Sequence, residues 1–263
     1  AQQFGFEVTE KEKKFGTGRD FVTSADRAAQ AIYLGMIREC LPGYGIVAEE
    51  DDLRVPCTLE GQQIWVTVDP LDGTRAFMRR QSQGIGTMVA LVTDDAVISA
   101  YVGDVITREI YGYRPESPRV HRISRYSIGV ELEVDEQKPL SRQYLLLHTE
   151  PSAFSKRAQR LFFTSERAFG SFEITRGSVG IEFARLWKGE VGGIMTLPGV
   201  VTPWDFCPLL GISRRLGFAF LAIRDEGLVR VEPPVIRDHH RLEDEFVIVH
   251  ESRIAEIREA YDE

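Results

Sequence analysis

The sequence predicts an α/β fold built as a layered sandwich of sheets and helices. The chain has 263 residues, which is long enough to bury a core without disulfide bonds. Hydrophobic residues make up 43% and charged residues 27%, a mixture that excludes disordered, collagen-like and coiled-coil chains. Short β-branched runs alternate with amphipathic segments in the second half, and this alternation is typical of α/β layers.

In the first half, a helix is expected to begin after Thr23. Thr23 is a good N-cap, and Asp26 stands where a capping box needs an acidic side chain. The Leu-Pro-Gly at 41–43 ends this helix, and the charged residues 1–22, with a solvated run at 11–14, form a lead-in. We expect a hairpin turn at 93–95 and strands at 44–48, 64–68, 88–92, 97–102 and 108–113.

The segment 114–138 is polar and lacks a hydrophobic period, so we place a boundary there. The expected halves are residues 1–130 and 131–263. In the second half the expected strands are 144–147, 193–196, 218–223, 229–231 and 246–249, and the expected helices are 182–188, 205–216 and 252–261.

The charge balance limits the partners that the chain can attract. Lys and Arg number 32 against 40 Asp and Glu, a net charge of −8, which argues against nucleic-acid and anionic-membrane binding. An anionic substrate would need another source of attraction, and a bound metal is the obvious one. Cys40, Cys57 and Cys207 fit neither a disulfide framework nor a zinc knuckle. We expect a soluble, cytoplasmic protein.

The segment 69–74, Asp-Pro-Leu-Asp-Gly-Thr, follows a β-branched run and carries the chemistry. Asp69 and Asp72 stand three apart on a turn that Pro70 stiffens, and Gly73 lets the backbone approach a ligand closely. Mg²⁺ prefers such oxygen ligands and completes its shell with substrate phosphate. By spacing alone, paired carboxylates of this kind commonly cap surface turns, so further acidic positions must support the site.

Two other carboxylates support it. Glu49 ends an apolar strand, and Asp205 follows Pro203 and Trp204 at an expected helix N-cap. Capping alone would explain Asp205, and a solvated loop would explain Glu49 and its neighbour Glu50.

Four segments together resemble the inositol monophosphatase family of metal-dependent phosphatases. Residues 65–74 resemble its first signature, 48–50 its upstream Gly-Glu-Glu element with Ala48 for glycine, 203–205 its second signature, and 20–26 its Asp-x-Val-Thr-x-x-Asp segment. The resemblance implies an αβαβα arrangement, with an antiparallel N-terminal sheet and a mixed C-terminal sheet.

The resemblance also implies two or three Mg²⁺ ions. One ion would be held by Glu49, Asp69 and the carbonyl of Leu71. A second would be held by Asp69, Asp72 and Asp205. Two metals of this kind neutralise the phosphate oxygens and activate an in-line water.

The resemblance gives the remaining catalytic roles to the Gly-Thr that ends the first signature. Thr74, paired with Asp26, would orient the attacking water and help to deprotonate it together with Glu49. The N–H groups of Gly73 and Thr74 would bind phosphate. Asp26 has a competing role in the capping box, and one carboxylate is able to serve both.

The sequence marks the residues that would contact the substrate less clearly than the metal ligands. Ser178, in a Ser-Val-Gly turn, and Arg75 are candidate substrate contacts, although Arg75 is equally well explained as a solvated arginine. Pro198 stands near the place of an inositol-binding glutamate, which argues against inositol phosphate. Residues 74–77 and 204–207 are closer to the histidinol-phosphate phosphatase branch. His148 ends an expected strand without an evident partner.

These observations predict a Mg²⁺-dependent, lithium-sensitive phosphomonoesterase that hydrolyses a small phosphorylated metabolite. A histidinol-phosphate, sugar or nucleotide phosphatase is the alternative within the family. The alternative of another class is a regulatory or interaction protein that keeps the fold. A homodimer is expected from the resemblance.

Overall fold

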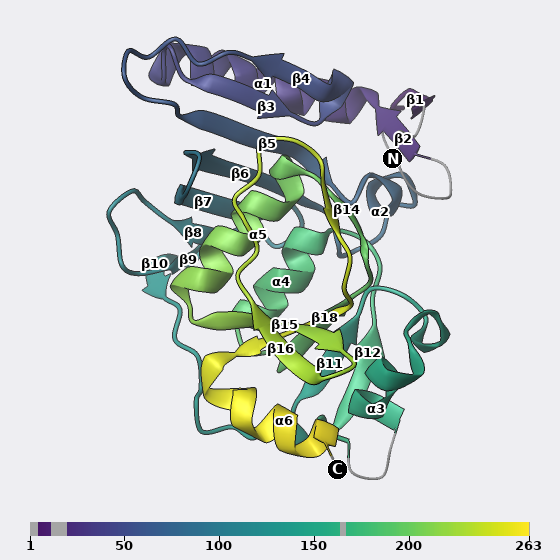
Figure 1. Ribbon diagram of the computed structural model, residues 1–263. Coiled ribbons are helices and arrows are strands. Elements are labelled where there is room, and N and C mark those ends of the chain that lie inside the picture. The colour runs from purple at the N-terminus through teal and green to yellow at the C-terminus, as the bar shows by residue number, and fades with distance from the viewer. Residues whose placement is uncertain (1–4, 12–19, 164–166, 263) are drawn as a thin grey trace.

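The larger sheet of the computed structural model has eight strands (Figure 1). The structure describes residues 5–11, 20–163 and 167–262. Neighbouring strands are antiparallel except for the parallel pair β3 and β5. Across the sheet the order is β10 (Ser127–Glu131), β9 (His121–Ser124), β8 (Glu109–Tyr113), β7 (Val97–Asp104), β6 (Gly86–Val92), β5 (Trp65–Asp72), β3 (Gly45–Ala48) and β4 (Leu53–Val55).

The second sheet has six strands and is mixed, as expected. β11 runs parallel to both of its neighbours, β12 and β13, whereas the other pairs are antiparallel. Its order is β12 (Ser171–Ile174), β11 (Tyr144–Leu147), β13 (Gly193–Thr196), β18 (Phe246–His250), β15 (Phe218–Arg224) and β16 (Gly227–Val231). Two small antiparallel pairs are β1 (Val8–Lys11) with β2 (Asp20–Thr23), and β14 (Gly199–Val201) with β17 (His240–Leu242).

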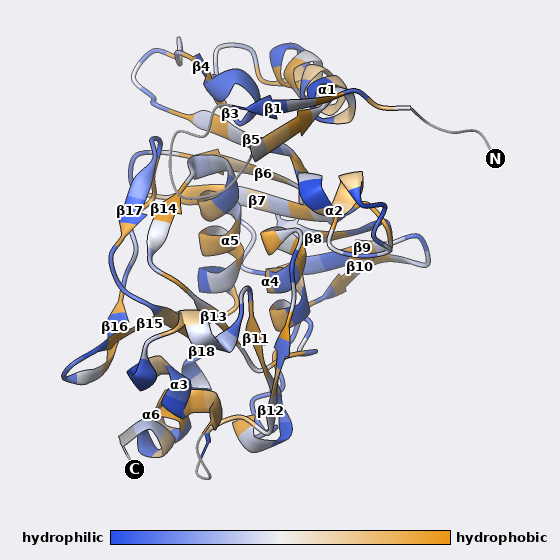
Figure 2. Cartoon of the chain, turned by 90° about the vertical axis from the view of Figure 1, so that its right-hand side faces the viewer, coloured by the Kyte–Doolittle hydropathy of each residue, from blue (hydrophilic) through white to orange (hydrophobic). Residues whose placement is uncertain are grey.

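The helices alternate with the sheets and confirm the αβαβα arrangement (Figures 1 and 2). The helix α1 packs on β5, α4 and α5 lie between the two sheets, and α6 packs on β16 with α3 beside it. The short α2 directly follows β5. The helices are α1 (Ser24–Cys40), α2 (Thr74–Met78), α3 (Lys156–Phe163), α4 (Val179–Trp187), α5 (Pro203–Arg215) and α6 (Ile254–Asp262).

One hydrophobic cluster fills the space between the sheets. It joins Met88 and Tyr111 of the first sheet to Trp187 of α4, Leu210 of α5 and Ile248 of the second sheet. Because this cluster draws on both halves of the chain, each half buries its inner face only against the other. The division into 1–130 and 131–263 stays a prediction.

The first helix is confirmed with its capping box: the Thr23 side chain accepts from the N–H groups of Ala25 and Asp26, and Asp26 accepts from the Thr23 N–H. The polar segment 114–138, in contrast, holds β9 and β10, which extend the large sheet. β10 is an edge strand with four exposed residues, so no alternation of buried and exposed positions marks it in the sequence. The lead-in also differs, because it contributes β1 and β2.

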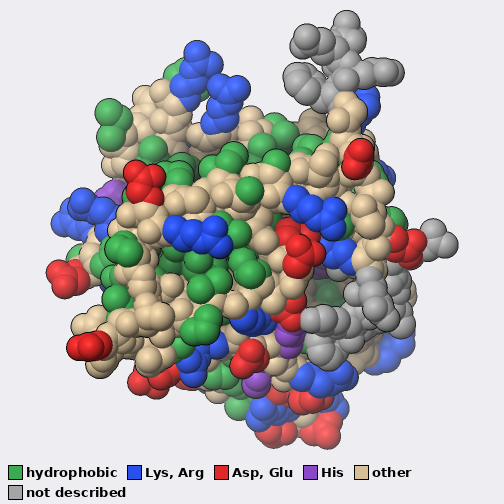
Figure 3. All heavy atoms as spheres, turned by 90° about the horizontal axis from the view of Figure 1, so that it is seen from above, with side chains coloured by type: hydrophobic (Ala, Val, Ile, Leu, Met, Phe, Trp, Pro, Cys, Tyr) green, Lys and Arg blue, Asp and Glu red, His purple; other side chains and the backbone are tan. Residues whose placement is uncertain are grey.

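The outer face of α1 forms part of the molecular surface. In Figure 3, which looks onto this side, hydrophobic side chains gather between scattered charges. Ile32 and Met36 of α1 are 66% and 60% exposed. Among the described residues, no helix has both the length and the apolar character that crossing a membrane requires.

Candidate metal centre and active site

Asp69 and Asp72 lie at the carboxyl end of β5, where the strand leaves its regular pairing. The register between β5 and β6 shifts between these two residues, so both carboxylates turn to the same side. All eight residues of β5 are buried, and Asp69 and Asp72 are only 2% and 7% exposed. The Asp69 carboxylate accepts from the Leu71 N–H at 3.0 Å, which fixes the turn.

Asp205 meets this pair from the other half of the chain. The structure corrects its expected place: the N-cap of α5 is Thr202, and Asp205 lies in the first turn, where the Thr202 hydroxyl donates to its carboxylate at 2.6 Å. One carboxylate oxygen each of Asp69, Asp72 and Asp205 lie within 4.8 Å of one another. Three acidic oxygens at this separation suit a hard divalent cation.

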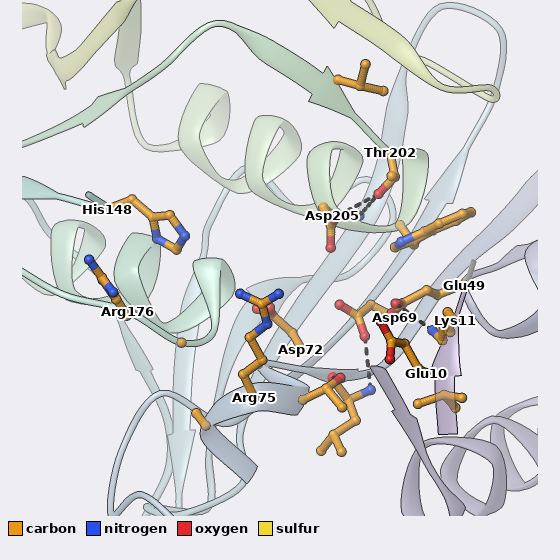
Figure 4. A pocket seen from close by; sticks show the side chains of 18 of the residues that line it. Glu10, Lys11, Glu49, Asp69, Asp72, Arg75, His148, Arg176, Thr202 and Asp205 are labelled. Atoms are coloured by element: carbon orange, nitrogen blue, oxygen red, sulfur yellow. Dashed lines mark hydrogen bonds and ion pairs between the residues drawn. The ribbon is translucent and has the colours of Figure 1, made fainter. Parts of the chain in front are cut away.

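Glu49 lies beside these three carboxylates, but it is ion-paired with Lys11. It follows β3, and because β3 and β5 are parallel neighbours, Glu49 and Asp69 end adjacent strands. Lys11 Nζ lies 3.1 Å from Glu49 Oε1 and 2.8 Å from Glu50 Oε1 (Figure 4). Lys11 was expected in a solvated run, yet its side chain is 19% exposed. The rest of that run, residues 12–14, lies outside the described residues.

The carboxylates carry more negative charge than their protein neighbours neutralise. Burial raises the pKa of Asp72 to about 6, although hydrogen bonds from Ser178 and Gly180 oppose the rise. Burial and repulsion by Glu49 and Asp72 raise the pKa of Asp69 well above its usual range. Burial raises the pKa of Glu49 to about 7, with Lys11 lowering it and Asp205 raising it. Buried acidic groups that repel one another in this way are typical of cation sites.

Thr74 lies beside the carboxylates and is held by Asp26. The Thr74 hydroxyl is 2.9 Å from Asp26 Oδ1 and 3.2 Å from the Leu71 carbonyl oxygen. The second oxygen of Asp26 accepts from the N–H and the hydroxyl of Thr23. Asp26 therefore serves both the capping box and Thr74, and it is fully buried between them.

Gly73 makes the sharp turn from β5 into α2. Its φ is +90°, and a Cβ added there would lie 2.3 Å from the Gly84 carbonyl oxygen and 2.8 Å from the Ser178 nitrogen. Any larger residue would push apart the segments that meet behind the site.

Ser178 does not take the place expected of a substrate contact. It is fully buried as the N-cap of α4, its hydroxyl donates to Asp72, and the same oxygen accepts from the Ile181 N–H at 3.0 Å. Asp72 also accepts from the Gly180 N–H at 2.7 Å. The first turn of α4 thus anchors the Asp72 carboxylate, and Ser178 acts on the site through Asp72.

A cleft of about 1230 Å³ opens over the carboxylates. Arg75, the other expected substrate contact, lines it and is exposed, with its guanidinium carbon 5.9 Å from the centre of the Phe21 ring. His148 has a partner that its sequence surroundings do not indicate. Nδ1 of His148 lies 2.8 Å from Oε1 of Glu182, which is buried, and His148 lines the cleft. The two residues stand 34 apart in the chain, so no local pattern links them.

Comparisons with known proteins agree with this geometry. A sequence profile of the inositol monophosphatase family matches residues 1–256. The inositol-1-monophosphatase of Bacillus subtilis is 22% identical over 218 residues, which cover 81% of this chain and 76% of that protein. The Nus factor SuhB of Escherichia coli K12 is 41% identical over 63 residues, which cover 23% of this chain and 22% of that protein.

Solved structures of the same family share the fold. A SuhB extragenic suppressor protein from Bartonella henselae superposes with a TM-score of 0.70 at 16% identity, covering 98% of this chain and 89% of that one. A structure described as an IMPase/NADP phosphatase with Mg²⁺ and phosphate gives a TM-score of 0.68 at 17% identity, covering 97% and 86%. The profile match across nearly the whole chain and the shared fold support a phosphatase: the protein belongs to the inositol monophosphatase family.

Proposed function

We propose that the protein is a Mg²⁺-dependent phosphomonoesterase that acts on a small phosphorylated metabolite. The observation that carries the proposal is the meeting of Asp69, Asp72 and Asp205 next to the Thr74–Asp26 hydrogen bond. A cation site alone needs no hydroxyl held by a buried carboxylate beside it. A phosphatase needs such a hydroxyl to orient the attacking water.

The carboxylate and carbonyl oxygens of the site are suitable ligands for a divalent metal ion. Asp69, Asp72 and Asp205 would hold one ion, and Asp69 with Glu49 and the Leu71 carbonyl oxygen would hold another once Glu49 is released from Lys11. Bound metal would neutralise the phosphate oxygens and lower the pKa of a water molecule. A family relative described with Mg²⁺ and phosphate supports this choice of ion.

The chain's own groups then supply orientation and proton transfer. The Thr74 hydroxyl donates to Asp26, which leaves an oxygen lone pair to accept a hydrogen bond from the attacking water and so to orient it. Glu49, at the end of the strand next to Asp69, is the proposed acceptor of a proton from that water. The N–H groups of Gly73 and Thr74 are the proposed phosphate contacts at the turn into α2.

The substrate class stays broad. Family relatives are described with D-inositol-1-phosphate, with NADP and with 2′AMP, so this fold accepts different phosphorylated molecules. Pro198 near the expected place of an inositol-binding glutamate favours a substrate other than inositol phosphate, such as histidinol phosphate or another sugar or nucleotide phosphate. Arg75 is the proposed contact to an anionic part of that substrate.

A second candidate is an interaction role, which the similarity to the Nus factor SuhB favours. The two roles are compatible in one protein. Retention of Glu49, Asp69, Asp72, Thr74 and Asp205 favours catalysis, because a protein that serves only as a binding partner does not need them. A homodimer is part of the same proposal.

Phosphate release from a panel of monoesters tests the proposal. The panel holds inositol 1-phosphate, histidinol phosphate, fructose 1,6-bisphosphate, adenosine 3′,5′-bisphosphate and glycerol 2-phosphate, each with Mg²⁺, with EDTA and with Mg²⁺ plus lithium. We expect Mg²⁺-dependent, lithium-inhibited hydrolysis with one preferred ester. Absence of hydrolysis in a folded protein that binds Mg²⁺ would favour the interaction role.

A further inference from the structure

Glu182 is a buried carboxylate that the proposed mechanism does not use. It lies in the first turn of α4, and its side chain is 4% exposed. Both of its carboxylate oxygens lie near Nδ1 of His148, at 2.8 and 2.9 Å. A buried carboxylate is costly unless it is paired and hydrogen-bonded, so this contact accounts for its presence.

His148 connects Glu182 to the cleft. It follows β11, and its side chain is 50% exposed on the cleft wall. Because Nδ1 donates to Glu182, Nε2 is left for a ligand, and the ring orientation is fixed. The hydrogen bond to Glu182 raises the pKa of His148 against the effect of its burial, and Asp72 raises it further while Arg176 lowers it.

Arg176 adds a guanidinium cation to this wall. It stands two residues before Ser178, lines the same cleft and is ion-paired with the exposed Glu150 at 3.1 Å. In Figure 4, His148 and Arg176 lie together on the side of the pocket away from Glu49 and Lys11, with Arg75 and Asp72 between. The cleft therefore has an acidic end, suited to metal, and an end lined by the His148 ring and the Arg176 guanidinium.

The first turn of α4 links this wall to the proposed metal site. Gly180 donates to Asp72, and Glu182, two residues on, accepts from His148. Asp72, His148 and Arg176 line the same cleft, and the charge of Asp72 acts on the His148 ring. A phosphoryl group at Asp72 would thus leave the rest of the substrate within reach of His148 and Arg176.

We propose that His148, positioned by Glu182, forms with Arg176 an anion-binding wall, and that the substrate carries a second acidic group, a carboxylate or phosphate, on its leaving-group side. This inference rests on the proposed function, because it takes the bound molecule to be a substrate. The binding preference itself does not depend on turnover. His148 and Arg176 are specificity-determining residues, and Glu182 is a positioning residue that acts through His148.

Two non-hydrolysable ligands that differ in one group test the wall directly. Propylphosphonate and 3-phosphonopropionate differ only in a terminal carboxylate, and titration calorimetry of each in the presence of Mg²⁺ gives the preference. We expect the carboxylated ligand to bind the wild-type protein about tenfold more tightly, as one charge-assisted hydrogen bond allows. His148→Gln and Arg176→Gln should each reduce this preference to about threefold or less and leave propylphosphonate unchanged.

Matched controls separate the effect of the anion-binding wall from the effects of a lost surface charge and of misfolding. Arg157→Gln removes an exposed, ion-paired arginine on α3 outside the cleft and should keep the preference. If Glu182 acts through His148, Glu182→Gln should reduce the preference in the wild-type background and have no further effect in His148→Gln. Additive losses would overturn the positioning role.

Kinetics with glycerol 2-phosphate and 2-phosphoglycerate separate this inference from the proposed function. His148→Gln should raise KM for 2-phosphoglycerate about threefold or more relative to KM for glycerol 2-phosphate. Equal binding of the two phosphonates by the wild-type protein would overturn the wall. A clear binding preference with no hydrolysis of either ester would overturn the proposed phosphatase function and leave the wall standing.

Discussion

The ammonium of Lys11 lies 3.1 Å from Oε1 of Glu49, at the edge of the Asp69, Asp72 and Asp205 carboxylates. The hairpin of β1 and β2 thus brings a cation of the chain itself to a carboxylate that resemblance assigns to metal. Glu50, 1% exposed, holds the same ammonium at 2.8 Å. These ion pairs raise the pKa of Lys11, although its burial alone would lower it, so the ammonium stays charged at neutral pH.

Lys11 should therefore compete with metal for Glu49. In Lys11→Met, Mg²⁺ should bind about fivefold more tightly, because a contribution of roughly 1 kcal/mol from the competing ion pair is removed. Calorimetric titration of the metal-free protein measures this. Lys156→Met, on α3, removes a lysine with a hydrogen bond to Gln159 and serves as the control. Weaker Mg²⁺ binding in Lys11→Met would show that Lys11 supports the metal site.

Asp72→Asn should abolish turnover while the fold is kept. The amide preserves the size of the side chain but removes a negative charge from the proposed metal site, and we expect a loss of about 100-fold or more in kcat. Circular dichroism and phosphate release measure fold and activity. Asp225→Asn, an exposed aspartate paired with Arg157, is the matched control. Activity like that of the wild type in Asp72→Asn would refute the metal assignment.

Ser178→Ala should act on the metal rather than on substrate choice. The hydroxyl donates to Asp72 and caps α4, so its loss should weaken Mg²⁺ binding by about 10- to 100-fold. The lost cap should also lower the free energy of unfolding by about 1 kcal/mol. Calorimetry and a comparison of KM for several esters measure these effects. A KM rise confined to one ester would restore Ser178 as a substrate contact.

Two substitutions of Thr74 separate the role of its hydroxyl from that of its methyl group. Thr74→Val keeps the shape of the side chain but removes the hydroxyl held by Asp26, and kcat should fall by about 100-fold or more. Thr74→Ser retains the hydroxyl and should stay within about threefold of the wild type. Steady-state kinetics at saturating Mg²⁺ give both values. A large loss in Thr74→Ser together with activity like that of the wild type in Thr74→Val would mean that the methyl group, and not the hydroxyl, matters.

The raised carboxyl pKa values predict how stability depends on pH in the metal-free protein. The pKa values of about 6 for Asp72 and about 7 for Glu49 and Glu50 exceed the unfolded-state values near 4. Between about pH 4 and about pH 7 the folded chain binds more protons than the unfolded chain, so the free energy of unfolding falls as the pH rises. Thermal melts in EDTA across this range measure the fall.

Mg²⁺ should reverse this trend, because it binds ionised carboxylates. The rise in Tm on adding Mg²⁺ should be small near about pH 5.5 and larger near about pH 8. In Asp69→Asn, the Tm should depend less on pH than in the wild type, both in EDTA and in Mg²⁺. A Tm increase that is the same at both pH values would contradict a carboxylate metal site.

The sequence predicted the parts of the site that lie close together in the chain. The turn from Asp69 to Thr74 is local, since a buried strand, a stiff proline and a glycine with positive φ specify it. The capping role of Asp26 was predicted from the fixed spacing of a capping box, whereas its pairing with Thr74 was implied only by the family resemblance.

The remaining features depend on contacts between distant segments. Lys11 looked like one of several solvated lysines, and only the pairing of β1 with β2 places it at Glu49. His148 and Glu182 meet because β11 pairs with β13, on which α4 packs, and a glutamate in a helix is expected to be exposed until packing buries it. Edge strands such as β10 carry no buried face for the sequence to mark.

The most direct test of the central claim is the position of metal in a crystal grown with Mn²⁺ and phosphate. We expect an anomalous difference peak between the carboxylates of Asp69, Asp72 and Asp205, with phosphate against the turn at Gly73 and Thr74. A cleft that stays empty of Mn²⁺ at saturating concentration, or Mn²⁺ bound only at other carboxylates, would contradict it.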